Sequence, residues 1–170
     1  MKSTIKTIVL LFLPLTIIAQ KKQPQTKSLV DIEGFEKLTQ EVMEYRETRL
    51  LPLDQFLEFA KDENTIILDT RSKSGYKQKH IKGAVHINFS DFTEKKLAKI
   101  IPSKNTRILI YCNNNIIGDT INFATKMAPL ALNIPTFINL YGYGYENVYE
   151  LSSLVLVEDK RLIFEGTTIK

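Results

Sequence analysis

Short apolar runs rich in β-branched residues alternate along this chain with segments of helical spacing. Three clear runs lie at residues 65–69, 107–111 and 148–151. Runs of this kind are typical of strands that are buried on both faces of a parallel sheet. Because helical segments separate these strands, the pattern predicts an α/β layer architecture with right-handed crossovers.

The rest of the pattern supplies helices and short strands. Functional sites in parallel α/β sheets lie beyond the carboxyl ends of the strands. The run 107–111 ends directly at Cys112, so this strand end is the first candidate for a site. We expect helices over 31–46, from Asp54 to about residue 62, from Ser90 to Ala98 and over 119–131, short strands at 49–51 and 84–87, and a covering strand within 152–170.

Cys112 is the only cysteine of the chain. The predicted strand 107–111 precedes it, and a loop and the predicted helix 119–131 follow it. Backbone N–H groups of such a loop, together with the helix dipole, favour the thiolate and lower the pKa of the thiol. We therefore predict that Cys112 is a nucleophile, with an inert buried thiol as the alternative.

The first nineteen residues have the features of a secretory signal. Lys2 and Lys6 precede an apolar stretch that ends at Ala19, a small residue at a plausible cleavage point. The stretch is shorter than the roughly 20 apolar residues that cross a bilayer, and Pro14 disfavours a spanning helix. We expect an exported protein, periplasmic or extracellular, without a stable membrane span after cleavage. The alternative is an uncleaved N-terminal anchor.

The composition disfavours several other classes of function. The formal charge is only +4, and the charges are scattered without the basic stripe and interleaved aromatics of nucleic-acid binders. We therefore expect no nucleic-acid partner. One cysteine allows no internal disulfide, and the spacing of His80, His86 and Cys112 matches no zinc pattern. We expect neither a metal nor a cofactor.

Three motifs resemble the signatures of the rhodanese-like domain family. The first is Asp69-Thr70-Arg71 followed by an aromatic residue and by His80-Ile81-Lys82-Gly83-Ala84. The second is Tyr111-Cys112 at the strand end, and the third is the segment 144–151 with its glycine, aromatic, asparagine and valine. The resemblance implies a three-layer α/β fold with a mostly parallel central sheet of about five strands flanked by helices.

The resemblance also divides the chain. The predicted parts are a signal peptide over 1–19, a polar linker over 20–30, an N-terminal helical extension over 31–47, a rhodanese-like domain over 48–151 and a C-terminal extension over 152–170.

The family's chemistry implies a role for Cys112 as a sulfur carrier. As a thiolate it takes sulfur from a donor such as thiosulfate, holds it as a persulfide and passes it to an acceptor, for example a protein thiol. Asp69, Arg71 and His80 are expected to support the site. We expect Asp69 and Arg71 to form a structural pair and His80 to be a hydrogen-bonded turn residue. The loop expected to bind substrate through its N–H groups comprises Asn113, Asn114, Asn115, Ile116, Ile117 and Gly118.

The loop departs from the family pattern because residues 113–118 carry no charged side chain. An anionic donor is attracted less, and Asp119 weakens the attraction further if it caps the next helix. A phosphatase is disfavoured, since no arginine follows Cys112 to clamp a phosphate. Two hypotheses follow: a sulfurtransferase of the thiosulfate sulfurtransferase type, or a catalytically weak module that binds a small anion or a partner thiol, or senses redox state.

Overall fold

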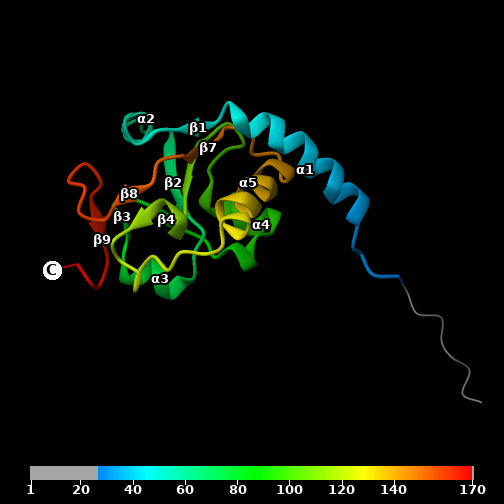
Figure 1. The fold of residues 1–170 in the computed structure, drawn as a ribbon. Coiled ribbons are helices and arrows are strands. Elements are labelled where there is room, and N and C mark those ends of the chain that lie inside the picture. Colours follow the sequence, from blue (N-terminus) through cyan, green and yellow to red (C-terminus); the bar gives the residue numbers. More distant parts are fainter. Residues whose placement is uncertain (1–26, 170) are drawn as a thin grey trace, which may run out of the picture. The chain divides into compact units, whose positions relative to one another are not determined.

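A computed structural model describes residues 27–169. Its centre is a five-stranded sheet of order β1-β7-β5-β2-β4, in which every neighbouring pair is parallel (Figure 1). These strands are β1 (Leu50–Leu51), β2 (Thr65–Asp69), β4 (Val85–His86), β5 (Arg107–Tyr111) and β7 (Val148–Leu151). The α/β fold with a mostly parallel sheet of about five strands is therefore confirmed.

Helices flank this sheet, and shorter elements complete the structure (Figure 1). The α-helices are α1 (Ile32–Glu47), α2 (Leu53–Phe59), α3 (Lys73–Gln78), α4 (Glu94–Ile100) and α5 (Asn133–Gly142). The 3-10 turns are η1 (Phe89–Asp91), η2 (Asn113–Asn115) and η3 (Ala128–Leu130). The remaining strands are β3 (His80–Ile81), β6 (Ile116–Ile117), β8 (Val155–Leu156) and β9 (Phe164–Glu165).

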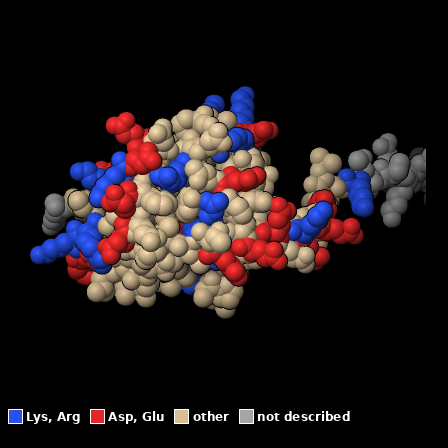
Figure 2. All heavy atoms as spheres, turned by 90° about the horizontal axis from the view of Figure 1, so that it is seen from above, with Lys and Arg blue, Asp and Glu red and all other residues tan. Residues whose placement is uncertain are grey.

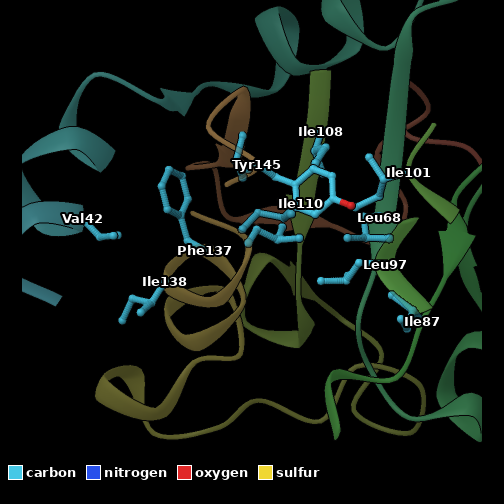
Figure 3. Close-up of a cluster of buried hydrophobic side chains, with 12 residues drawn as sticks. Val42, Leu68, Ile87, Leu97, Ile101, Ile108, Ile110, Phe137, Ile138 and Tyr145 are labelled. Atoms are coloured by element: carbon cyan, nitrogen blue, oxygen red, sulfur yellow. The ribbon is translucent and has the colours of Figure 1, made fainter. Parts of the chain in front are cut away.

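The central strand β5 shows how the sheet divides the core into two layers. Side chains of a strand alternate between the two faces of its sheet. Ile108 and Ile110 face one layer, where they pack with Val42 of α1, Leu97 of α4 and Phe137 of α5 (Figure 3). Leu109 and Tyr111 belong to the opposite layer, which contains α2. Cys112 continues the alternation on the α5 side.

The predicted helix over 119–131 is wrong. This segment is irregular apart from the turn η3, and the helix that covers the sheet begins only at Asn133. Pro129 has no N–H group and disfavours the interior of a helix. Ile121 is 86% exposed, whereas Phe123 is buried in the layer opposite α5. The apolar residues that suggested one helical face are thus separated in space.

Other helix starts shift by a few residues for local reasons. Asp31 caps α1 by accepting a hydrogen bond from the N–H of Gly34 at 2.9 Å. Thr93, and not Ser90, caps α4, because η1 occupies the residues before it. Pro52, and not Asp54, stands at the start of α2. The length of α1 is as predicted, whereas α2 and α4 are shorter than predicted, and the order of these elements is unchanged.

The C-terminal extension contains the covering strand that the sequence predicts. Strand β9 pairs antiparallel with β3, and β8 pairs in parallel with β6. Beyond β9, the N–H groups of Thr167 and Thr168 donate to the carbonyls of Lys77 and Gln78 at 2.9 and 3.0 Å. The extension therefore closes over the turn between α3 and β3.

The surface is of mixed charge on the face that Figure 2 shows, where Lys and Arg are interspersed with Asp and Glu. No helix within residues 27–169 has the length and apolar character that crossing a bilayer requires. The predicted signal peptide over 1–19, and most of the predicted linker over 20–30, lie outside the described residues.

Candidate active site

Cys112 lies at the carboxyl end of β5, the middle strand of the sheet. Its backbone is extended, with φ −144° and ψ −174°, and the chain then turns into η2. The residue is only 1% exposed. The thiol is thus at the predicted strand end, but it is covered by its surroundings.

Backbone N–H groups from two separate segments face the sulfur. The N–H of Asn114 donates to Sγ at 3.4 Å. The N–H groups of Leu132 and Asn133, at the start of α5, also act on the thiol. No side chain caps α5, so these amides remain available to the sulfur. The sulfur therefore faces a helix N-terminus, as predicted, but the helix begins at Asn133 rather than at Asp119.

Burial raises the pKa of the Cys112 thiol above its ordinary value. The N–H groups of Asn114, Asn133 and Leu132 lower the pKa, and the carboxylate of Glu150 raises it. The prediction of a lowered pKa is wrong, because desolvation of the thiolate outweighs the three donors. The resting group at neutral pH is therefore a protonated thiol.

The side chains of the three consecutive asparagines, residues 113–115, make different contacts. Asn115 accepts from the N–H of Cys112 at 2.9 Å and donates to the carbonyl of Leu151 at 2.7 Å, which ties η2 to the end of β7. Asn114 and Lys126 exchange two hydrogen bonds of 2.8 and 3.0 Å between side chain and backbone. Asn113 borders the adjacent cleft. The asparagines thus shape the loop, and one backbone amide contacts the sulfur.

The second half of the predicted substrate loop leads away from the thiol. Ile116 and Ile117 form β6, which pairs with β8. Gly118 has φ +93°, and a Cβ at this position would lie 3.2 Å from the Glu158 and Val157 side chains. These three residues join the loop to the C-terminal extension, and the start of α5 takes their expected place beside the sulfur.

A cleft of about 510 Å³ lies beside the strand end, and its lining includes Leu132 and Asn113, the residue after Cys112. Hydroxyl and amide side chains contribute much of its wall. Lys126, a residue that the sequence analysis missed because it lies well beyond Gly118, adds a cation. The other lining residues are Thr70, Arg71, Ser72, Ser74, Gly75, Gln78, Asn88, Phe89, Ser90, Ile121, Asn122 and Ala124.

Arg71 forms the expected pair with Asp69, with Nη2 at 2.6 Å from Oδ2 and both side chains buried. The guanidinium also donates to the carbonyl of Asn122 at 3.0 Å and lies 4.5 Å from the centre of the Phe123 ring. Tyr111 donates to the same carboxylate. Arg71 thus fastens the irregular segment to the end of β2 while its charge is balanced by Asp69.

His80 is hydrogen-bonded within the turn. Its Nδ1 lies 2.6 Å from the carbonyl of Tyr76, and its Nε2 lies 3.2 Å from the carboxylate of Glu165. Its ring stacks on that of Tyr76 at 3.8 Å. None of these contacts involves Cys112, so the structure places His80 with β9 and not with the thiol.

Asp119 anchors the far end of the irregular segment. It accepts from the N–H and the side chain of Asn122, and it pairs with Lys79 at 3.0 Å. Burial raises the pKa of Asp119, but the contacts with Asn122 and Lys79 outweigh it and lower the pKa to about 2. Asp119 therefore caps a local turn, and its carboxylate does not occupy the N-terminus of α5.

We expect Asp119→Asn to destabilise the fold at pH 6 by at most about 2 kcal/mol. The lowered pKa stabilises the folded state above about pH 4, and this contribution is lost as the pH falls toward 2. Urea unfolding of both proteins from pH 6 to pH 2.5 checks this, since the difference between them should shrink toward zero. Asp54→Asn, at an exposed carboxylate, is the control. A difference that stays constant over this range would contradict the role of the carboxylate.

Among residues 27–169, no three His, Cys, Asp or Glu side chains form a group that could hold a metal ion.

The residue that sequence reasoning missed beside the sulfur is Asn133. Its side chain donates to Asn115 at 2.9 Å and to Glu150 at 3.1 Å. A signal for this contact was present, because Glu150 is a charged residue inside an apolar strand and requires a polar partner.

The sequence model of the rhodanese-like domain family matches residues 52–153, more than half of the chain. Together with the parallel sheet and a cysteine at the end of its central strand, this match shows that the chain belongs to the rhodanese-like domain family. The sequence analysis predicted this family. No curated protein matches the chain.

Solved structures are similar in fold. The BH2092 protein from Bacillus halodurans is 19% identical, with a TM-score of 0.53 over 78% of this chain and 87% of that chain. A rhodanese-like domain from Anabaena sp is also 19% identical, with a TM-score of 0.50 over 71% of this chain and 80% of that chain. A single-domain sulfurtransferase of Saccharomyces cerevisiae is 13% identical, with a TM-score of 0.41 over 63% and 85% of the respective chains. At these identities, the first two likenesses show the fold alone.

Proposed function

We propose that this protein is an exported sulfurtransferase in which Cys112 carries sulfur as a persulfide. The observation that supports this best is the hydrogen bond of the Asn114 N–H group to the sulfur at the end of β5, at 3.4 Å. The N–H groups of Leu132 and Asn133, at the start of α5, also favour the thiolate. Donors fixed at a helix N-terminus stabilise negative charge on sulfur in the thiolate and in the persulfide anion.

The reaction has two sulfur transfers. The thiol of Cys112 first loses its proton to water, and the thiolate attacks the outer sulfur of the donor. With thiosulfate the donor's S–S bond breaks, its electron pair leaves on sulfite, and Cys112 becomes a persulfide. An acceptor thiolate then attacks the outer sulfur, and the electron pair of the broken bond returns to Cys112.

The cleft favours a donor of low charge. Asp69 balances the charge of Arg71, so Lys126 is the cation of the cleft wall that no ion pair in the described residues neutralises. Hydroxyl and amide groups around it recognise polar groups without requiring a dianion. We therefore expect an alkyl persulfide, R–S–SH, or a protein persulfide to load Cys112 faster than thiosulfate does.

Intact-mass measurement of the purified chain after incubation with each donor tests this proposal. We expect a gain of one sulfur atom that is absent in Cys112→Ser, with faster loading from the alkyl persulfide than from thiosulfate. Release of the sulfur on addition of a small thiol would complete the cycle. A folded wild-type chain that takes up no sulfur from either donor would overturn the proposal of a sulfurtransferase.

A second candidate function rests on the burial of the thiol. A cysteine that is 1% exposed and has a raised pKa suits a module that binds a small anion or a partner thiol, or senses redox state, without sulfur turnover. Absence of an adduct, combined with a mixed disulfide formed by a small disulfide reagent, would favour this module.

The proposal of export rests on residues 1–19, which lie outside the described residues. Expression with this segment in a bacterium, followed by cell fractionation and N-terminal mass analysis, tests it. A periplasmic or secreted chain that begins at Gln20 is expected. A membrane-bound chain that begins at Met1 would instead show an N-terminal anchor.

A further inference from the structure

A buried ion pair connects helix α1 to the surroundings of Cys112. Glu150, on β7, has a side chain that is 8% exposed. Arg46, near the end of α1, binds both of its carboxylate oxygens, with Nε at 2.6 Å and Nη2 at 2.7 Å. A buried carboxylate is costly unless it is paired and hydrogen-bonded, and this two-point contact with Arg46 supplies both the counter-ion and the hydrogen bonds.

Asn133 extends this contact to the sulfur. Its side-chain amide donates to Glu150 at 3.1 Å and to Asn115 at 2.9 Å. The acceptor atom on Asn115 also receives the backbone N–H of Cys112 at 2.9 Å. Asn133 is the first residue of α5, and its own backbone N–H acts on the sulfur. One side chain thus ties the carboxylate to both segments that hold the thiol.

We propose that Arg46 is a positioning residue for Cys112: it neutralises and holds Glu150, and Glu150 through Asn133 holds the start of α5 against the sulfur. Arg46 lies before the residues 52–153 that match the family model. The helix in front of the domain therefore contributes to the site. This inference rests on the proposed function only in that Cys112 is the reactive group.

The electrostatic part of the role follows from the charged groups around the thiol. Glu150 is the carboxylate that acts on Cys112, and it disfavours the thiolate. Arg46 compensates this charge from α1. On the cleft side the charged groups are Lys126 and the balanced pair of Arg71 and Asp69. Without Arg46 the thiolate would face an uncompensated, buried negative charge, and the pKa of Cys112 would rise further.

The test is the pH dependence of the alkylation of Cys112 by iodoacetamide in the full chain and its variants. We expect Arg46→Met to react about tenfold more slowly than wild type at a fixed pH below the thiol pKa, equivalent to about one pKa unit. Arg46→Met combined with Glu150→Gln should regain most of the rate, because no uncompensated charge remains. Glu150→Gln alone should react several-fold faster than wild type.

Arg49→Met is the matched control. Arg49 contacts the hydroxyls of Tyr45 and Tyr149 at 2.6 Å and, among residues 27–169, no carboxylate, so its loss should leave the alkylation profile unchanged. An Arg46→Met profile equal to that of Arg49→Met, or a loss that Glu150→Gln does not restore, would overturn the inference.

If the Arg46→Met variant does not fold, the alkylation profile of Glu150→Gln becomes the test. A Glu150→Gln profile equal to that of wild type would overturn the inference. Alkylation requires no sulfur transfer. The alkylation profiles can therefore shift as expected in a chain that takes up no sulfur from either donor. That combination would reject the proposed enzyme and support the positioning role of Arg46.

Discussion

The rate at which iodoacetamide alkylates Cys112 is expected to rise about tenfold with each pH unit from pH 6 to pH 8, without a plateau. Only the thiolate reacts, and below the pKa its fraction increases tenfold per unit. Burial raises the pKa of this thiol above its ordinary value, so the whole range lies on the rising limb. Sulfur loading, which uses the same thiolate, should follow the same profile.

The unfolded chain supplies the control for this measurement. In urea, Cys112 is exposed and its pKa returns to that of an ordinary cysteine, so the rate at each pH should exceed that of the folded protein. A plateau below pH 8 in the folded protein would mean that the N–H groups of Asn114, Leu132 and Asn133 dominate over burial. That result would contradict the raised pKa of Cys112.

Arg71→Met is expected to destabilise the fold by about 3–5 kcal/mol. The substitution keeps much of the side-chain volume but leaves the carboxylate of Asp69, which is fully buried, without its counter-ion. It also removes the hydrogen bond to the carbonyl of Asn122, which fastens the segment 119–126. Urea unfolding at pH 7 measures the free-energy change.

Arg161→Met is the matched control for the buried pair. Arg161 and Asp159 show the same 2.6 Å contact, but the arginine side chain is 54% exposed. Water solvates both charges there, so its loss should change stability little. Asp69→Asn should restore part of the stability that Arg71→Met removes. Equal effects of the two arginine substitutions would contradict the importance of burial.

The sheet was predictable because its strands are marked by composition. The runs 65–69 and 107–111 coincide with β2 and β5, and the short strand predicted at 49–51 is β1, at the edge of the sheet. The isoleucines of β2 and β5 pack into both layers of the core, which is typical of buried parallel strands. The position of Cys112 at a strand end follows from the same pattern.

The structure of the segment 119–131 and the start of α5 could not be predicted from the same composition pattern. Residues 119–131 have helical spacing, but Phe123 is drawn into the layer beneath Arg71, and the segment stays irregular. Helical spacing predicts that the apolar residues share one face of one helix. In this segment they do not share a face, because Phe123 is buried and Ile121 is exposed. Beside the Asn114 N–H of the predicted loop, the sulfur therefore has donors from Leu132 and Asn133, which no local pattern around Cys112 indicates.

The reactivity of the thiol also depends on a quantity that sequence spacing does not contain. Donor groups were expected from the loop, and the structure has them. Whether they lower the pKa depends on how much water the fold removes from the sulfur. Cys112 is only 1% exposed, and two of the donors that act on it, Leu132 and Asn133, come from a part of the chain outside the predicted loop.

The pairing of β9 with β3 has a consequence for the order in which this protein can assemble. His80 and Glu165 meet across 85 positions of the chain. A nascent polypeptide emerging from the ribosome can form the parallel sheet before its partner for the α3–β3 corner has been translated. The corner between α3 and β3 therefore receives its partner strand only after β7, the last strand of the central sheet, has been translated.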